Sequence, residues 1–300
     1  MSAIIITRGL TKSYGNQRGV IELNLEVQKG EVFGYLGPNG AGKTTTIRTL
    51  LDFIRPTQGQ ASIFGLDTRE RSTDIHARVG YVPGELTLYD QMTGEQYLHF
   101  IANLRGGVDW TIVEDMARRL SADLSRPLRG LSHGNKRKIV LIQAFMHKPE
   151  LVILDEPSSG LDPLVQQEFY QLIREVKADC RTVFLSSHVL PEVERVCDRV
   201  AIIREGKLIA VEEISTLKTR ALRRLEIHFG APVPHEAFAV VEGVRDITID
   251  DLILHCTVAG SLDALIKAAA RFNVVNIISQ EPSLEEIFLT YYGGGANHAA

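Results

Sequence analysis

Cysteine and long hydrophobic runs are scarce in this chain of 300 residues. The three cysteines, Cys180, Cys197 and Cys256, are widely separated and form no CxxC pair, which argues against a zinc site or a disulfide framework and fits a reducing compartment. No apolar run approaches the ~18 to 20 residues that span a bilayer. The first residues also lack the basic region and apolar core of a signal peptide. We therefore expect a soluble chain with no direct membrane insertion.

A strong net charge is missing as well. The chain has 33 Lys and Arg against 37 Asp and Glu, which gives a net charge of −4. This balance does not indicate nucleic-acid binding by bulk electrostatics, and we expect no nucleic-acid partner. Charged residues make up 23% and hydrophobic residues 44%, an ordinary globular composition. The length allows one large domain or two of ordinary size.

The first two-thirds of the chain alternate short strand-like runs with amphipathic helical stretches, which predicts an α/β fold. A helix is expected from the lysine of a glycine-rich loop through Leu51, ending before Pro56. The pattern is wholly helical over 90–124, which predicts a helical subdomain over about 88–145. The expected strands cover residues 4–10, 20–27, 31–36, 60–64, 151–154, 182–186, 200–204 and 207–211.

The pattern changes at a basic cluster over 217–224, so we expect a first domain over 1–217 and a small α+β domain over 222–292. The second domain should contain strands at 225–229 and 274–279, and two strands that meet at Asp250 and Asp251. Ser261 is expected to cap one helix, and the capping box that begins at Ser283 is expected to open the last one. Residues 293–300 should form a disordered tail.

A phosphate-binding loop lies between an expected strand and an expected helix. The sequence fits G-x-x-x-x-G-K-[ST] in the context that this motif requires. Backbone amides near Gly40 and Gly42 can turn towards phosphate oxygens at the helix N-terminus. Lys43 should reach the β- and γ-phosphates of ATP, Thr44 should ligate Mg²⁺, and Thr45 could contact the α-phosphate side. The ATP-binding set of this loop is Gly37, Pro38, Asn39, Gly40, Ala41, Gly42, Lys43, Thr44 and Thr45.

Two acidic residues follow the apolar run 151–154. The carboxyl ends of strands in an open parallel sheet are where ligands bind. Asp155 suits Mg²⁺, and Glu156 suits polarisation of an attacking water. Together with the phosphate loop, this pair predicts hydrolysis of ATP rather than binding alone.

The segment 131–138 reads Leu-Ser-His-Gly-Asn-Lys-Arg-Lys at the head of an expected helix. The Ser132 hydroxyl and the Gly134 amide suit the γ-phosphate of an ATP molecule held by a second copy of the protein. This segment therefore points to an ATP-driven dimer.

At this point the chain resembles the ATP-binding subunit of an ATP-binding-cassette (ABC) transporter over residues 3 to about 215. The resemblance implies that Tyr14 stacks on adenine and that 159–162, which ends at Asp162, contacts the nucleotide across the dimer. It also implies that His188 hydrogen-bonds the γ-phosphate and acts in catalysis with Glu156 and Lys43. The first domain would then be a P-loop ABC cassette.

Two positions depart from the family pattern. Gly84 stands where the family normally has a glutamine that senses Mg²⁺ and the attacking water. Either water completes the site, Glu85 takes over, or the loop couples differently. His133 and Asn135 replace the commonest Gly and Gln in the segment that contains Ser132, which affects accessory contacts rather than its role.

The resemblance implies an ATPase of the ABC-2 exporter class, which includes antibiotic and drug pumps. Its expected partners are a second cassette, identical or different, with a homodimer expected, and an integral membrane permease. The permease would dock a short helix on 86–100; the alternative is that the apolar residues of this segment serve ordinary helix packing. We expect it to be cytoplasmic and peripheral on the inner face of the membrane, with a C-terminal domain that stabilises the dimer or packs. Alternatives are export of a lipid, polysaccharide or other envelope component, a soluble ABC ATPase, or a nucleotide sensor without turnover, which only Gly84 favours.

Overall fold

The computed structural model describes residues 2–15, 17–220, 223–258 and 260–280. The expected helix that begins at Ser283 and the expected tail 293–300 lie outside these residues. Contacts between Cα atoms divide the chain into two compact units, Met1–Val211 and Glu212–Ala300. Each unit is described by itself, and the predicted domain limits stay predictions.

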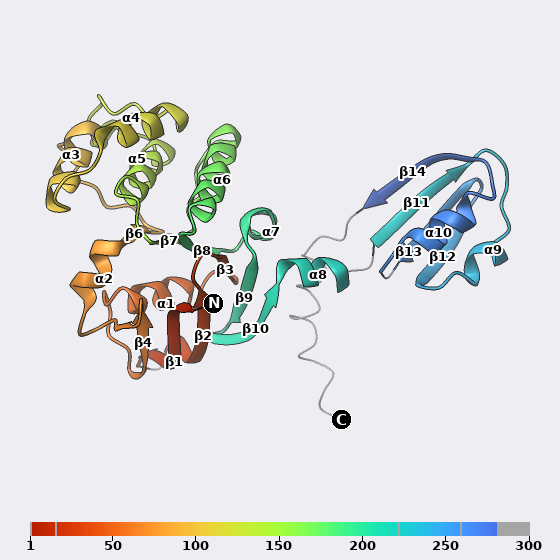
Figure 1. Cartoon of the computed structure of the whole chain (residues 1–300), viewed down its shortest axis with the longest axis horizontal. Helices are drawn as coiled ribbons and strands as arrows, with labels where there is room; N and C mark the ends of the chain where they lie inside the picture. Colours follow the sequence, from red (N-terminus) through yellow and green to blue (C-terminus); the bar gives the residue numbers. More distant parts are fainter. Residues whose placement is uncertain (1, 16, 221–222, 259, 281–300) are drawn as a thin grey trace. The chain divides into compact units, whose positions relative to one another are not determined.

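Two sheets form the first unit (Figure 1). A four-stranded antiparallel sheet has the order β2-β1-β4-β5. Its strands are β1 (Ala3–Tyr14), β2 (Gln17–Gln28), β4 (Gln58–Ile63) and β5 (Leu66–Asp67). A six-stranded sheet has the order β10-β9-β3-β8-β7-β6. Its strands are β3 (Val32–Leu36), β6 (Val79–Val82), β7 (Leu151–Asp155), β8 (Thr182–Ser187), β9 (Arg199–Arg204) and β10 (Lys207–Glu213).

The centre of the six-stranded sheet is parallel and buried. β3 pairs in parallel with β8 and β9, and β7 pairs in parallel with β6 and β8. Every residue of β3, β7 and β8 is buried, as expected for strands covered on both faces. The carboxyl ends of these three strands therefore meet at one edge of the sheet, where each is followed by a segment that the sequence assigns to the site.

Helices connect these strands. Three of them, α3, α4 and α5, follow one another between β6 and β7 and gather at one end of the unit (Figure 1). The helices of the first unit are α1 (Lys43–Leu50), α2 (Ser72–Arg78), α3 (Gly94–Leu104), α4 (Trp110–Arg119), α5 (His133–Phe145), α6 (Pro163–Ala178) and α7 (Leu190–Val196), with a 3₁₀ turn at Leu128–Gly130.

The structure corrects several expectations. The segment 90–124 is not wholly helical, because Thr93 caps α3 and two glycines with positive φ, Gly106 and Gly107, separate α3 from α4. The strands expected at 4–10, 20–27 and 60–64 are present. They form an antiparallel sheet of their own, a pairing that the sequence analysis did not address. The sequence analysis missed α2.

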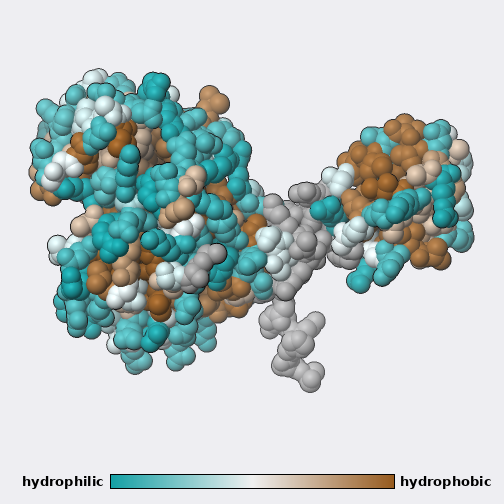
Figure 2. Space-filling model, in the orientation of Figure 1, coloured by the Kyte–Doolittle hydropathy of each residue, from teal (hydrophilic) through white to brown (hydrophobic). Residues whose placement is uncertain are grey.

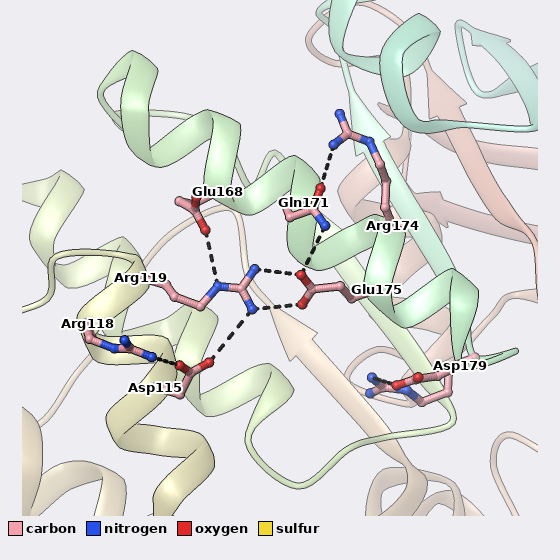
Figure 3. A network of polar contacts seen from close by, with 9 residues as sticks. Asp115, Arg118, Arg119, Glu168, Gln171, Arg174, Glu175 and Asp179 are labelled. Atoms are coloured by element: carbon pink, nitrogen blue, oxygen red, sulfur yellow. Dashed lines mark hydrogen bonds and ion pairs between the residues drawn. The ribbon is translucent and has the colours of Figure 1, made fainter.

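An ion-pair network joins the three-helix segment to α6 (Figure 3). The guanidinium of Arg119, at the end of α4, makes two contacts of 2.8 and 2.9 Å with the Glu175 carboxylate. It also donates to Glu168 at 3.2 Å. Both acids belong to α6. A fork-to-fork pair of this kind fixes direction as well as distance, so the network orients α4 against α6.

The second unit contains an antiparallel sheet of order β12-β13-β11-β14. Its elements are α8 (Ile214–Arg220), β11 (Arg223–Phe229), α9 (Glu236–Ala239), β12 (Val244–Asp250), β13 (Ile253–Val258), α10 (Asp263–Ala269) and β14 (Val274–Gln280). The order of elements from β11 onwards is the βαββαβ arrangement, in which Ile227, Phe238, Leu254 and Leu265 lie in the core. Leu262, not Ser261, is the N-cap of α10, although the Ser261 hydroxyl accepts the Asp263 N–H. Of these helices, α8 and α9 were not predicted.

Hydrophobic residues gather on the visible face of this second unit (Figure 2). The exposed apolar side chains of this unit include Ile266 of α10 and Val275 and Ile277 of β14, which are 45%, 68% and 42% exposed. Across the described parts of the chain, no helix combines the length and apolar character needed to cross a membrane.

Candidate functional site

The phosphate-binding loop runs from the end of β3 to the start of α1. Gly42 is the N-cap of α1 with φ of 106°, and Gly40 has φ of 79°, so both lie in the left-handed region that favours glycine. A Cβ at Gly37 would lie 2.4 Å from the Ile203 carbonyl oxygen, so a side chain is sterically excluded there. The Lys43 ammonium donates to the carbonyls of Gly37 and Pro38 at 2.7 and 3.2 Å. The loop therefore curls around its own lysine, as a phosphate cradle requires.

Glu156 joins the loop to the end of β8. Its Oε1 lies 3.1 Å from Lys43 Nζ, and its Oε2 contacts Nδ1 of His188. Lys43 is buried, the Glu156 side chain is 20% exposed and that of His188 is 47% exposed. Three residues assigned to catalysis from separate parts of the sequence thus lie in one chain of contacts that opens towards solvent.

Asp155 is fully buried beside this group. It accepts hydrogen bonds from Thr44 Oγ1 at 2.8 Å and from Ser186 Oγ at 2.5 Å. A carboxylate and a hydroxyl are hard oxygen donors of the kind that Mg²⁺ takes from proteins, with waters and phosphates supplying its other ligands. The residues present therefore fit the ion that the sequence predicts.

The segment at 131–138 begins α5. Ser132 is its N-cap and is exposed, and the hydroxyl accepts the Asn135 N–H at 3.3 Å. A Cβ at Gly134 would lie 2.3 Å from the Gly160 carbonyl oxygen, which requires glycine. Asp162 caps α6 through a bond from Val165 N at 3.0 Å, and this bond lowers the pKa of the Asp162 carboxyl. The structure thus gives Gly134 and Asp162 packing and capping functions beside their predicted contacts with ATP.

Tyr14 lies at the end of β1 and is 46% exposed. Lys12 Nζ lies 5.1 Å from the centre of its ring. A Cβ on Gly19 would meet the Tyr14 ring at 3.2 Å, and a Cβ on Gly42 would meet the Gly19 carbonyl at 2.8 Å. Gly19 therefore lies between the ring and the phosphate-binding loop. Stacking of Tyr14 on adenine stays a prediction.

Glu192, which the sequence analysis missed, lies buried behind this site. Its Oε2 accepts from Ser187 Oγ at 2.7 Å, and Oε1 has no hydrogen-bond partner among the described residues. Burial raises the pKa of the Glu192 carboxyl, and hydrogen bonds from Ser187 and Ser158 oppose the rise. In sequence, Glu192 reads as an ordinary solvated residue of a short helix.

Gly84 lies directly against the predicted magnesium ligand. A Cβ at Gly84 would be 3.2 Å from Asp155 Oδ2. The carbonyls of Pro83 and Gly84 accept hydrogen bonds from the buried guanidinium of Arg137 on α5, at 2.6 and 2.9 Å. Glu85 is exposed, and a substitute role for it stays a prediction. The sequence analysis did not single out Arg137.

Comparison with known proteins gives consistent matches. A family model described as ABC transporter matches residues 20–159. The bacitracin transport ATP-binding protein BcrA of Bacillus licheniformis is 36% identical, over 98% of this chain and 99% of its own length. The linearmycin resistance ATP-binding protein LnrL of Bacillus subtilis (strain 168) is 30% identical, over 95% of this chain and 96% of its own.

Solved structures agree with this assignment. A structure of the ATP-binding subunit of an ABC transporter superposes with a TM-score of 0.65 at 29% identity, covering 72% of this chain and 92% of the other. The dimeric cassette MJ0796 superposes with a TM-score of 0.65 at 20% identity, and the match covers 70% of this chain and 98% of the cassette chain. This similarity shows the shared fold. With its phosphate loop, its acidic strand end and relatives that match it from end to end, the chain belongs to the ATP-hydrolysing, ATP-binding subunits of ABC transporters.

Proposed function

We propose that two copies of this chain hydrolyse ATP between them to drive export of an antibiotic or similar drug through a separate membrane subunit. The observation that carries the proposal is the contact chain from Lys43 through Glu156 to His188. It brings a phosphate-binding cation, a general base and a polar group for the γ-phosphate to one point. These are the parts that hydrolysis needs.

The loop amides and Lys43 bind the phosphates. Thr44 and Asp155 would hold Mg²⁺, which would supply positive charge that offsets the charge of the phosphates. Glu156 orients a water molecule and accepts a proton from it as the water attacks the γ-phosphate. Both carboxylate oxygens are already in contact with protein groups, so one of them must leave Lys43 or His188 in order to bind the water. His188 then donates to the γ-phosphate. Lys43 and Thr44 belong to the first turn of α1, Asp155 is the last residue of β7, and Glu156 and His188 directly follow β7 and β8.

The second copy contributes Ser132 and Gly134. The exposure of Ser132 at the start of α5 supports this, because an exposed side chain is accessible to a second copy of the protein. Two ATP molecules would then be shared in an isologous dimer. Loss of the γ-phosphate removes contacts that exist only in the closed state, so hydrolysis shifts the dimer towards opening.

A cavity of about 280 Å³ suits the docking of a membrane subunit. The residues around it are mainly apolar or aromatic, and the exposed Phe53 and Tyr89 lie in or near the same region. Its lining comprises Leu51, Phe53, His76, Val79, Tyr81, Pro83, Thr87, Leu88, Tyr97, Arg105, Val140, Gln143 and Ala144. The predicted docking segment 86–100 contributes three of these residues, namely Thr87, Leu88 and Tyr97. We infer that a short helix of a permease docks here, which places the chain at the inner face of the membrane.

The names of the relatives support an antibiotic substrate. Bacitracin transport and linearmycin resistance are functions of proteins that match nearly the whole of this chain. The second unit shows no chemical signature in its described residues. The exposed apolar side chains of its β14 and α10 favour a packing or dimer-stabilising role.

The test is Mg²⁺-ATP turnover by the chain reconstituted with its membrane partner, compared with Glu156→Gln. Loss of the base should lower turnover by about 10²-fold or more. Equal turnover in the two would overturn the ATPase assignment. Vesicles loaded with a cyclic peptide antibiotic or with a labelled lipid then distinguish drug export from export of an envelope component.

A further inference from the structure

Arg137 is a buried cation that the proposed catalytic cycle does not use. It is 1% exposed, although it lies between two lysines in the sequence. Its Nη1 and Nη2 atoms donate to the carbonyls of Pro83 and Gly84, and its Nε has no hydrogen-bond partner in the described part of the chain. Burial lowers the pKa of Arg137, and the charges of Asp155 and Glu156 oppose that change. A guanidinium remains charged in proteins under these conditions, so the helix α5 holds a permanent charge against the loop.

The loop that Arg137 holds has the proposed permease cavity on one side and the magnesium ligand on the other. Pro83 lines the cavity. Gly84 abuts Asp155, since a Cβ there would come within 3.2 Å of Oδ2. Two consecutive residues thus connect a docking surface to the carboxylate that is predicted to bind the ion.

The same helix begins with Ser132, the residue proposed to contact ATP in the other copy. Arg137 is therefore placed where three parts meet: the start of α5, the permease cavity and the carboxylate at the end of β7. Only the backbone of Pro83 and Gly84 is held. Backbone hydrogen bonds suit this loop, because Gly84 has no side chain that Arg137 could hold.

We propose that Arg137 is a positioning residue that clamps the Pro83–Gly84 loop and transmits movement of α5 and of the docked permease to Asp155. This rests on the proposed function, because it assumes the ATPase and the docking cavity. The clamp takes over, through two backbone carbonyls, the connection that a glutamine side chain at Gly84 would make. Arginine suits the task because its planar fork addresses two acceptors at once, which lysine cannot do.

The test uses the chain reconstituted with its membrane subunit. Arg137→Gln should lower kcat for Mg²⁺-ATP by about tenfold or more, as expected for the loss of two charge-assisted hydrogen bonds. The affinity for ATP without Mg²⁺ should stay within about twofold, since Lys43 and the phosphate loop are untouched. Arg137→Lys should restore part of kcat. Arg118→Gln is the matched control, because that arginine lies in the same three-helix segment with its side chain 79% exposed.

A double-mutant cycle separates the clamp from a general packing role. Gly84→Gln alone forces a side chain against Asp155 while Arg137 holds the loop. In the Arg137→Gln background the loop can yield, so the same change should raise kcat there and lower it in the parent. Multiplicative effects of the two substitutions, or a kcat of Arg137→Gln equal to that of the parent, would overturn the proposal. Failure of the proposed function gives a different result, because the Mg²⁺-ATP turnover of the parent would then be no higher than that of Glu156→Gln.

Discussion

At the scale of single residues, Glu156 has the most constrained position in the site. Its φ of 51° lies in the left-handed region, although it is not glycine. Such backbone conformations are unfavourable by about 1–3 kcal/mol and persist where the surroundings fix them. Here the amide of Glu156 donates to the Ser186 carbonyl at 3.1 Å, and its carboxylate contacts Lys43 and His188. The strained turn aims the carboxylate at the phosphate loop instead of along the strand.

The proposed magnesium site leads to a prediction about Thr44. Thr44→Val removes the hydroxyl that lies 2.8 Å from Asp155 and keeps the shape of the side chain. The Mg²⁺ concentration for half-maximal hydrolysis should rise by about tenfold, equivalent to roughly 1.4 kcal/mol, and ATP binding without metal should persist. Thr49→Val is the matched control, because Thr49 is a buried threonine of the same helix that bonds the Thr45 carbonyl. The same Mg²⁺ dependence in both variants would contradict the assignment.

Glu192 gives a prediction about pH. Burial is the main cause that raises the pKa of its carboxyl in the folded protein. The folded state then holds the proton to higher pH than the unfolded state, so this group destabilises the protein increasingly as the pH rises above the ordinary value of 4.5. Glu192→Gln keeps the shape and removes the ionisation. The Tm of Glu192→Gln should exceed that of the parent by about 2–4 °C at pH 8 and by less at pH 5. A Tm shift of this size corresponds to ~1 kcal/mol in a large domain.

Scanning calorimetry at the two pH values measures this difference. Glu95→Gln serves as the control, since it removes a carboxylate from the exposed surface of α3. A Tm difference between Glu192→Gln and the parent that is constant with pH would mean that burial of the charge does not govern the effect.

At the scale of elements, the network around Arg119 determines how the three-helix segment meets α6 (Figure 3). Arg119→Ala removes the fork that contacts Glu175 and Glu168. Because these groups are partly exposed, we expect a loss of only about 1 kcal/mol, or about 2–4 °C in Tm, and a smaller loss at high salt. Arg118→Ala, next to it but 79% exposed, should change Tm by less. Thermal unfolding at low and high salt tests the pair, and equal losses would contradict an orienting role.

The elements also show how far the sequence alone leads. The phosphate loop and Asp155 with Glu156 could be predicted because each motif is contiguous and its flanking strand is apolar throughout. The separate antiparallel sheet could not, since β1, β2 and β4 alternate in the same way whichever partner they pair with. Arg137 was missed for a related reason: beside Lys136 and Lys138 it has the pattern of a solvated face, and only the packing of α5 on the loop buries it.

At the scale of the whole molecule, the chain divides near residue 211 into two units with separate cores. All the residues assigned to ATP lie in the first unit. A chain that ends after Thr219 should therefore bind ATP with an affinity within about twofold of the parent, because the first unit keeps its own core. Assembly with the membrane subunit, or the ratio of transport to hydrolysis, should weaken. Nucleotide titration and co-purification measure both, and loss of ATP binding in the truncated chain would show that the units depend on each other.

The close contact between Gly134 and Gly160 has a genetic consequence. With the Gly160 carbonyl 2.3 Å from where a Cβ at Gly134 would lie, even Gly134→Ala should displace the backbone at the start of α5 while leaving the phosphate loop of the same copy intact. In the proposed dimer, a variant subunit that pairs with a normal one would make one of the two shared ATP sites defective and leave the other intact. Co-expression with the normal protein should therefore lower the ATP turnover of the assemblies that contain the variant.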